Sequence, residues 1–392
     1  MAGLKICHIV GHGDQRAIKE CLALKFAGHE VLLLTRAVNA YANAFDRLIF
    51  FDDDPSLIRA IKDTEADIYH IHCKPECIPR LSIQTLMEVG RPWVYDVHDL
   101  DLTRFEHTTS GELYSLLNSP YLIYPDAGIE ERANQLFFNH FPAELRPKSL
   151  SLLPYYSMID LVYPMIQPNP AASRERIRKI VYEGNIIVPA IENIKNFPYY
   201  DMRFTSHVLS QWGYEMHIYP VGIDFNQARQ FYDTSDAIMH VPVDYPTLVQ
   251  EMGRYGWGFF GAFTKSAQAS NTFANKIFDY ICAGIPCVVM NADRMGQFLE
   301  ETGFGVVIRS FEDIVQLKEN VTRWEDMQQR ILTERGKYSM EANIGQLVAF
   351  YELALADKCW VRNRDKDISS AIVDAENLGN ILASQQHSGE GE

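Results

Sequence analysis

A lysine and an aspartate stand three positions apart at the start of a predicted helix, and their chemistry suits ligand binding. Lys276 and Asp279 belong to the segment NKIFDYICAGIPCVVM, residues 275–290. An ammonium near a helix N-terminus favours an anion such as a phosphate, and a carboxylate can accept two hydroxyl hydrogen bonds. The helix is predicted to end at Gly284, before a buried strand. The alternative interpretation is a plain helix–strand joint.

A histidine and an aspartate follow another predicted strand. His98 and Asp99 come directly after the run WVYDV at 93–97. A histidine can hydrogen-bond a reacting group and stabilise developing charge near neutral pH. Asp99 could orient this ring or accept a proton from a second substrate. The alternative is a His–Asp capping pair where the strand meets a helix.

The loop after the first predicted strand is rich in glycine. Gly11, His12 and Gly13 stand in the segment GHGD. The pattern is not G-x-G-x-x-G, so it does not predict a dinucleotide site. A tight turn into the next helix is the alternative to a ligand-binding loop.

Two further segments contain residue types that bind metals. In HIHCKPEC, strand alternation places His70 and His72 on one face and Cys73 on the other. Structural zinc sites usually need two ligand pairs that close a tetrahedron, so we expect no metal there. The acidic run Asp52–Asp54 precedes a proline, which is typical of a helix N-terminus, and we expect no metal there either.

All these residues are predicted to lie beside two doubly wound parallel sheets. In such sheets ligands bind outside the carboxyl ends of the strands, so we expect an active site in a cleft between two Rossmann-like domains. Strands are predicted at 5–10, 30–35, 47–51, 67–72, 93–97, 122–124, 149–154, 179–183, 214–220, 237–240, 257–260, 286–290 and 305–308, and helices at 15–27, 55–64, 81–89, 205–212, 245–254, 275–283 and 295–302.

The segment QPNP at 167–170, with two prolines, predicts a domain boundary. The expected division is an N-terminal domain at 1–172, a C-terminal domain at 173–345, a crossing helix at 346–372 and a disordered tail at 373–392. The basic run at 174–179 is interpreted as a solvated linker rather than a binding patch.

Composition narrows the classes of partner. Of the 392 residues, 47% are hydrophobic and 22% charged, and the net charge of −15 disfavours nucleic acid and anionic lipid, which bind lysine and arginine. The N-terminus has no signal-like apolar stretch, and no run is long enough to span a membrane. Seven scattered cysteines suit reduced thiols. We expect a cytoplasmic protein, and the oligomeric state stays open.

The run K-I-F-D-Y-x-x-A-G-I-P-x-V-V resembles the donor-site signature of the GT-B glycosyltransferases, especially the large retaining family four. The resemblance implies that Asp279 holds the ribose hydroxyls of a nucleotide and that Lys276 contacts its diphosphate. It also implies donor contacts for Asn271 and Thr272. Members often carry a glutamate where this chain has Asn271.

The resemblance extends to three other places. Gly184 matches the glycine after the first strand of the donor domain, and Lys195 matches a phosphate-binding lysine, although the arginine that often accompanies it is missing. His98 matches a histidine close to the reacting sugar. The glycine-rich loop at 11–13 is expected to face the donor phosphates.

The resemblance implies a hexosyltransferase that uses a nucleoside diphosphate sugar as substrate, needs no cofactor or metal, and acts on a saccharide or other hydroxyl acceptor, with retention. A nucleotide-sugar 2-epimerase shares this fold and is the first alternative. A catalytically weak nucleotide- or partner-binding homologue is the second, suggested by Asn271 and the missing arginine. Sugar transfer to modified DNA bases is a third, disfavoured by the charge.

Overall fold

The computed structural model describes residues 3–12, 15–38, 44–73, 77–101, 108–139, 141–143, 146–157, 174–188, 200–221, 224–261, 270 and 273–357. They group into two compact units. Unit 1 comprises described residues of Met1–Leu153 and Asn343–Glu392, and unit 2 those of Pro154–Ala342. The predicted boundary between 172 and 173 lies outside the described residues.

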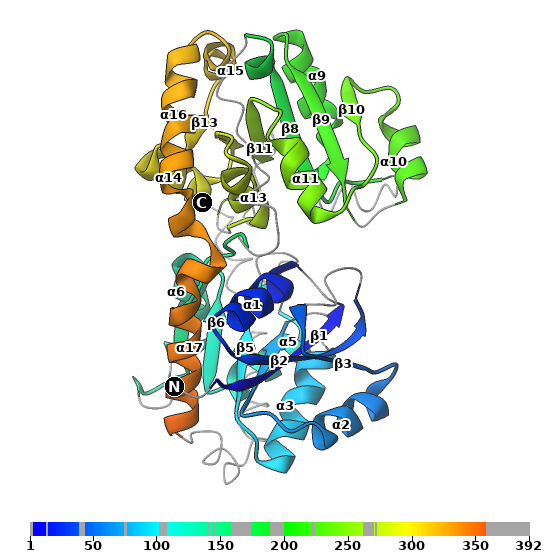
Figure 1. Ribbon diagram of the computed structural model, residues 1–392, viewed down its shortest axis with the longest axis vertical. Helices are drawn as coiled ribbons and strands as arrows, with labels where there is room; N and C mark the ends of the chain where they lie inside the picture. The colour runs from blue at the N-terminus through cyan, green and yellow to red at the C-terminus, as the bar shows by residue number, and fades with distance from the viewer. Residues whose placement is uncertain are drawn as a thin grey trace, which may run out of the picture. The chain divides into compact units, whose positions relative to one another are not determined.

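Unit 1 is built on a seven-stranded parallel sheet in the order β3-β2-β1-β4-β5-β6-β7 (Figure 1). This order reverses between β1 and β4, which is the doubly wound pattern. Its elements are β1 (Lys5–His12), α1 (Gln15–Phe26), β2 (Glu30–Ala37), β3 (Arg47–Phe50), α2 (Asp54–Asp63), β4 (Ile68–His72), α3 (Cys77–Val89), β5 (Trp93–Asp96), α5 (Ser110–Asn118), β6 (Tyr121–Tyr124), α6 (Ala127–Ala133), the π-helical turn η2 (Asn134–Phe138), β7 (Lys148–Ser151) and α17 (Met340–Asp357).

Unit 2 repeats this plan with six parallel strands in the order β10-β9-β8-β11-β12-β13. The order reverses between β8 and β11. Its elements are the 3-10 turn η4 (Arg176–Arg178), β8 (Lys179–Gly184), α9 (Met202–Gln211), β9 (Glu215–Pro220), α10 (Phe225–Tyr232), β10 (Ala237–Met239), α11 (Tyr245–Met252), β11 (Trp257–Gly261), α13 (Asn275–Ala283), β12 (Cys287–Met290), α14 (Asp293–Thr302), β13 (Gly305–Ile308), α15 (Phe311–Leu317), α16 (Val321–Glu334) and the 3-10 turn η6 (Arg335–Tyr338). The predicted fold class, two parallel α/β units in tandem, is confirmed.

Local sequence signals set several element ends. Asp53 caps α2: its side chain accepts from the backbone N–H of Ser56, while the Ser56 hydroxyl lies within bonding distance of the Asp53 backbone N–H. This capping box satisfies N–H groups that a helix start leaves open, and it confirms the helix-start interpretation of the acidic run. Gly284 ends α13 in the left-handed conformation, with φ +73°, as predicted.

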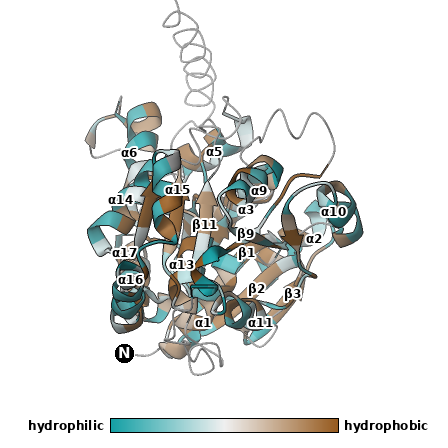
Figure 2. Ribbon diagram, turned by 90° about the horizontal axis from the view of Figure 1, so that it is seen from above, coloured by the Kyte–Doolittle hydropathy of each residue, from teal (hydrophilic) through white to brown (hydrophobic). Residues whose placement is uncertain are grey.

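Strand alternation gives the unit 1 sheet two unlike faces. One face carries Cys7, Ile9, Tyr69 and Ile71, which pack against α2, α3, α5 and α6 in an apolar core. Figure 2 shows the strands largely in the hydrophobic colour and the outer helices with hydrophilic faces. The other face carries buried polar side chains, described below. The sheet therefore has an apolar packing face and, opposite it, a face with buried polar side chains, here called the chemical face.

Helix α17 extends from Met340 to Asp357, and its described residues from 343 onward belong to unit 1. Asp357 accepts a hydrogen bond from the Tyr121 hydroxyl at 2.8 Å, and Lys148 forms an ion pair with the same carboxylate. No helix in the described part of the chain combines the length and hydropathy needed to cross a bilayer.

Candidate functional site

The carboxyl end of β8 in unit 2 brings together three of the residues singled out in the sequence. β8 ends at Gly184, which has φ +116°. Helix α13 packs beside this end, since the Tyr280 hydroxyl accepts from the Glu183 N–H at 3.3 Å and donates to the Phe259 carbonyl at 3.0 Å. Lys276 and Asp279 lie on this anchored helix.

The ammonium of Lys276 is buried, with 8% of the residue exposed. Nζ donates to the Tyr182 hydroxyl at 3.2 Å and lies over two rings, 4.3 Å from that of Tyr182 and 5.2 Å from that of Phe260. Burial lowers the pKa of Lys276, and the nearby Glu183 carboxylate opposes the shift. A cation held by a neutral phenol and aromatic faces can accept an anion.

Among the described residues, no side chain caps the N-terminus of α13. Its N-cap residue, Ala274, makes no side-chain capping hydrogen bond. Uncapped N–H groups at a helix start attract anions. Lys276 and this helix end therefore form one anion-favouring corner beside Gly184.

Asp279 is buried, with 1% exposed, and accepts a short hydrogen bond from the Tyr245 hydroxyl. Burial and the Asp279 charge raise the pKa of Tyr245 well above its ordinary value, so the phenol stays a donor. A ribose that binds Asp279 must displace this phenol or share the carboxylate with it. Sequence reasoning did not foresee the Tyr245 contact.

Four predicted donor residues lie outside the described residues: Gly13, Lys195, Asn271 and Thr272. Gly11 and His12 belong to β1 itself rather than to the loop after it, because the strand pairs with β2 as far as His12 opposite Ala37. Within β1, Gly11 is buried and His12 is exposed.

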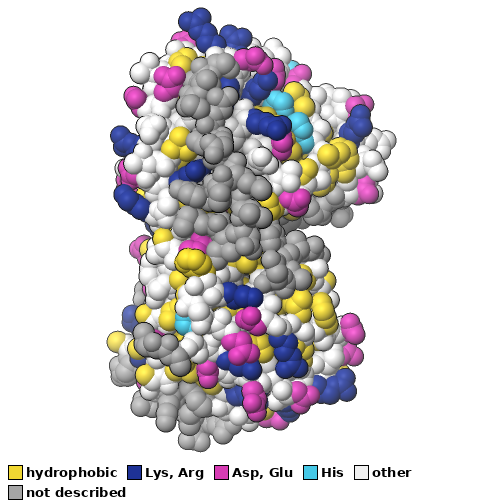
Figure 3. All heavy atoms as spheres, viewed as in Figure 1, with side chains coloured by type: hydrophobic (Ala, Val, Ile, Leu, Met, Phe, Trp, Pro, Cys, Tyr) yellow, Lys and Arg dark blue, Asp and Glu magenta, His cyan; other side chains and the backbone are white. Residues whose placement is uncertain are grey.

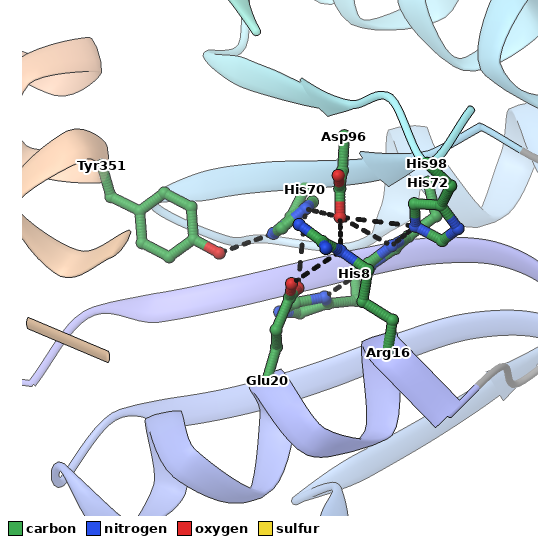
Figure 4. A network of polar contacts seen from close by, with 8 residues as sticks. All are labelled: His8, Arg16, Glu20, His70, His72, Asp96, His98 and Tyr351. Atoms are coloured by element: carbon green, nitrogen blue, oxygen red, sulfur yellow. Dashed lines mark hydrogen bonds and ion pairs between the residues drawn. The ribbon is translucent and has the colours of Figure 1, made fainter. Parts of the chain in front are cut away.

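A second cluster of polar groups occupies the chemical face of unit 1 (Figure 4). Register explains its composition: His8 on β1 pairs with His70 on β4, and His72 pairs with Asp96 on β5. All four therefore point to the same face. Three further residues join them there: Arg16 and Glu20 from α1, and Tyr351 from α17.

The imidazoles form a hydrogen-bonded chain that reaches His98. Nδ1 of His8 lies 3.0 Å from Nε2 of His72, and Nδ1 of His72 lies 3.1 Å from Nε2 of His98. His70 bonds the Tyr351 hydroxyl through Nδ1, at 2.6 Å. The side chain of His98 is 17% exposed, while the other imidazoles of the chain are buried.

Asp96 is the hub of this cluster. Its Oδ2 accepts from Nε of Arg16 at 2.8 Å and lies 3.4 Å from Nε2 of His98. Burial works to raise the pKa of Asp96, but the Arg16 guanidinium and His98 outweigh it, and the pKa lies well below its ordinary value. Burial lowers the pKa of His70 to about 3, so this ring stays neutral.

Sequence reasoning identified His98 and suggested Asp99 as its partner. The structure places Asp96 at Nε2 of His98, and Asp99 is half-buried in the same loop. Sequence reasoning missed Asp96, although it is a polar residue at the end of an apolar strand, two positions before His98.

Unit 2 carries another imidazole pair, which is partly buried. Nδ1 of His217 on β9 lies 2.9 Å from Nε2 of His240, and the rings stack at an interplanar angle of 21°. Tyr219 stacks on His240. Figure 3 shows histidine side chains on this face of the unit.

The basic run at 174–179, before β8, was interpreted as a solvated linker. This interpretation is wrong for Arg176, which is buried and donates to the carbonyls of Gly253 and Tyr255.

Comparison by sequence finds neither a family model nor a curated protein that matches the chain. Solved structures do match. HepE of Anabaena, in complex with UDP and glucose, is 13% identical, with a TM-score of 0.64 over 88% of this chain and 98% of its own. An alpha-glucosyltransferase in complex with UDP is 9% identical, with a TM-score of 0.61 over 89% and 100%.

A third match is a protein described as a putative UDP-N-acetylglucosamine 2-epimerase, from Listeria monocytogenes, 11% identical, with a TM-score of 0.55 over 89% of this chain and 95% of its own. At such identities a likeness shows the fold alone. The chain therefore has the fold that GT-B glycosyltransferases and this epimerase share, with two Rossmann-like parallel-sheet units in tandem.

Proposed function

We propose that this protein transfers a hexosyl group from a nucleoside diphosphate sugar to a hydroxyl acceptor, with retention at the anomeric carbon. The observation that carries the proposal is the buried ammonium of Lys276, which stands beside Gly184 and the uncapped start of α13. A diphosphate is the anion that suits this corner, because it can take an ammonium and helix N–H groups together.

The nucleoside is assigned to Asp279. Its carboxylate lies one helical turn from Lys276 on the same helix, so a bound nucleotide can place its phosphates at one residue and its ribose at the other. The ribose hydroxyls take over the carboxylate that otherwise bonds Tyr245. Uridine diphosphate is the first candidate, since HepE and the alpha-glucosyltransferase were solved with UDP.

In this proposal His98 acts on the reacting sugar. It is the most exposed ring of the hydrogen-bonded series His8–His72–His98, and the Arg16 guanidinium keeps Asp96 beside it ionised. An imidazole next to a fixed carboxylate can donate a hydrogen bond to a sugar hydroxyl and favour the positive charge that develops at the anomeric carbon.

The experiment is a thermal-shift panel with UDP-, GDP-, ADP- and TDP-sugars, followed by product analysis. We expect one nucleotide class to raise the melting temperature of the wild-type protein and to fail with Asp279→Asn. The product should keep the anomeric configuration of the donor, as read from the anomeric proton coupling. No shift with any sugar nucleotide contradicts the proposal and favours a partner-binding protein.

The 2-epimerase is the second candidate, favoured by the match to the Listeria protein. Incubation with the stabilising UDP-sugar in the absence of any acceptor separates the two. An epimerase forms the C2 epimer or its elimination product under these conditions, while a transferase releases a sugar-bearing product only when a hydroxyl acceptor is added.

A further inference from the structure

Three side chains at the ends of β4 and β5 form a nearly equilateral triangle of donor atoms. Nδ1 of His72, Oδ2 of Asp96 and Nε2 of His98 are 3.1, 3.4 and 3.5 Å apart in their three pairs. All three atoms lie close enough together to hold one metal ion. Figure 4 shows the two rings and the carboxylate converging.

These separations suit a tetrahedral ion. Zinc–nitrogen and zinc–oxygen bonds of about 2.0–2.2 Å put neighbouring ligand atoms of a tetrahedron about 3.3–3.6 Å apart. Both distances to Asp96 fall in this range, and the His72–His98 distance is slightly shorter. An ion needs no side-chain movement larger than about a few tenths of an ångström to fit the triangle.

Ring orientation favours this triangle over the neighbouring group of His8, Glu20, His70 and His72, whose donor atoms also lie close together. A ring nitrogen offers its lone pair in the plane of the ring. His70 and His72 stack at only 8°, so their lone pairs cannot meet at one point. The planes of His72 and His98 are inclined by 71°, which lets both lone pairs converge.

The surroundings support the ligands as outer partners do in metal sites. The other nitrogen of His72, Nε2, bonds His8 at 3.0 Å and fixes the ring. Asp96 is fully buried, and its Oδ2, the oxygen of the triangle, also accepts from Nε of Arg16 at 2.8 Å. The charge of a cation bound at Oδ2 offsets part of the cost of burying this carboxylate.

Charge balance points the same way. The cluster sets one guanidinium, Arg16, against two carboxylates, Glu20 and Asp96. These three charged groups sum to one negative charge. A divalent ion converts this to one positive charge, which a bound anion or hydroxide can offset. Arg16 lies 3.2 Å from Glu20 as well, so its charge does not fall on Asp96 alone.

The geometry points to a divalent transition-metal site of the zinc class, held by His72, Asp96 and His98. Three protein ligands leave a fourth position open, and His98 is the partly exposed member through which solvent or a ligand reaches it. Two imidazoles and a carboxylate select such ions over magnesium or calcium, which prefer oxygen ligands. Its three ligands belong to unit 1, whereas Lys276 and Asp279 of the nucleotide corner belong to unit 2.

The test is titration of the full-length protein, first stripped with chelator, with Co²⁺ and then with Zn²⁺ as competitor. Wild-type protein should bind one equivalent of Co²⁺ with the visible absorption of a tetrahedral complex, and Zn²⁺ should displace it. His98→Ala should weaken Co²⁺ binding at least tenfold. His98→Cys should restore binding and add a thiolate charge-transfer band, which a purely structural role of His98 does not produce.

His240→Ala is the matched control. It removes one ring of a hydrogen-bonded imidazole pair of similar distance, 2.9 Å, whose stacked rings cannot converge on an ion, so binding should equal that of wild type. Absence of Co²⁺ uptake by folded wild-type protein overturns the site, as does wild-type affinity in His98→Ala. Asp279→Asn should keep the metal while losing the sugar nucleotide, which separates this inference from the proposed function.

Discussion

The ammonium of Lys276 lies 3.2 Å from the position that a Cβ atom on Gly184 would occupy. Gly184 ends β8 with φ +116°, a backbone conformation that side chains rarely adopt. The glycine thus serves two needs at once: the strand can turn, and the lysine can lie against its backbone. Both are features of the corner that we assign to the diphosphate.

Gly184→Ala should therefore damage binding as well as stability. The new methyl group strains the backbone, at a cost of about 1–3 kcal/mol, and pushes the ammonium away from its position. We expect the affinity for the stabilising sugar nucleotide to fall at least tenfold, measured by calorimetric titration at a temperature where the variant is folded.

Gly213→Ala is the matched control for Gly184→Ala. Gly213 also has a positive φ, +77°, and the Nζ atom of Lys318 lies 3.5 Å from the position that a Cβ atom on Gly213 would occupy. This variant should lose a comparable amount of stability and keep wild-type affinity. Equal loss of affinity in both variants would show that backbone strain alone explains the effect.

Lys276→Met should separate affinity from stability. Burying the ammonium costs desolvation free energy, and its hydrogen bond goes to the neutral Tyr182 hydroxyl. An apolar side chain of similar length should therefore leave the free energy of unfolding equal or higher. Nucleotide affinity should nevertheless fall at least tenfold. Urea denaturation and titration with the sugar nucleotide measure the two quantities.

Lys179→Met controls for loss of charge in the same unit. Lys179 pairs with Glu175 at 2.9 Å on the surface, where an ion pair contributes about 0–1 kcal/mol. Neither stability nor affinity should change much. A Lys276→Met protein that binds nucleotide as well as the Lys179→Met protein would remove Lys276 from the site.

Tyr245→Phe tests the assignment of Asp279 to ribose. The phenol donates to this carboxylate, so it competes with an incoming hydroxyl group. Its removal should leave nucleotide affinity unchanged or raise it, whereas Asp279→Asn should lower it at least tenfold, because an amide accepts more weakly and carries no charge. If both variants lose affinity equally, the hydrogen bond between Tyr245 and Asp279 stabilises the fold of the site, and Asp279 is not the ribose ligand.

Patterns within single elements were predictable from the sequence. The capping box of Asp53 and the left-handed Gly284 depend on residues a few positions apart. Alternation in HIHCKPEC also placed His70 and His72 on one face, and the structure confirms it by stacking the two rings. Each of these features is decided by the local backbone, which the sequence specifies directly.

The partners of these residues were not predictable, because pairing between distant elements decides them. Asp96 meets His72 through the register of β4 and β5, and Tyr351 reaches His70 from 281 positions away. Arg176 has the sequence environment of a solvated arginine, yet two carbonyls and the ring of Trp324 enclose it. Burial of long polar side chains depends on tertiary contacts that no single segment encodes.

The His217–His240 pair should make unit 2 sensitive to acid. Burial lowers the pKa of His217 to about 4; hydrogen bonding to Glu215 opposes this shift, and His240 adds to it. The unfolded chain protonates this ring near pH 6.5, while the folded protein keeps it neutral. The stabilising effect is therefore complete above pH 6.5 and is lost as the pH falls from there toward 4.

Chemical denaturation of wild type and His217→Gln from pH 7 to pH 5 measures this loss. Glutamine does not titrate, so the difference in unfolding free energy between the two proteins should shrink on acidification, by up to about 1.4 kcal/mol per pH unit below about 6.5. His207→Gln is the control, because that ring is exposed and pairs with Asp236 at the surface; its curve should lack this convergence with wild type. A constant difference between wild type and His217→Gln would show that the folded protein accepts a proton on this ring, and that burial does not hold it neutral.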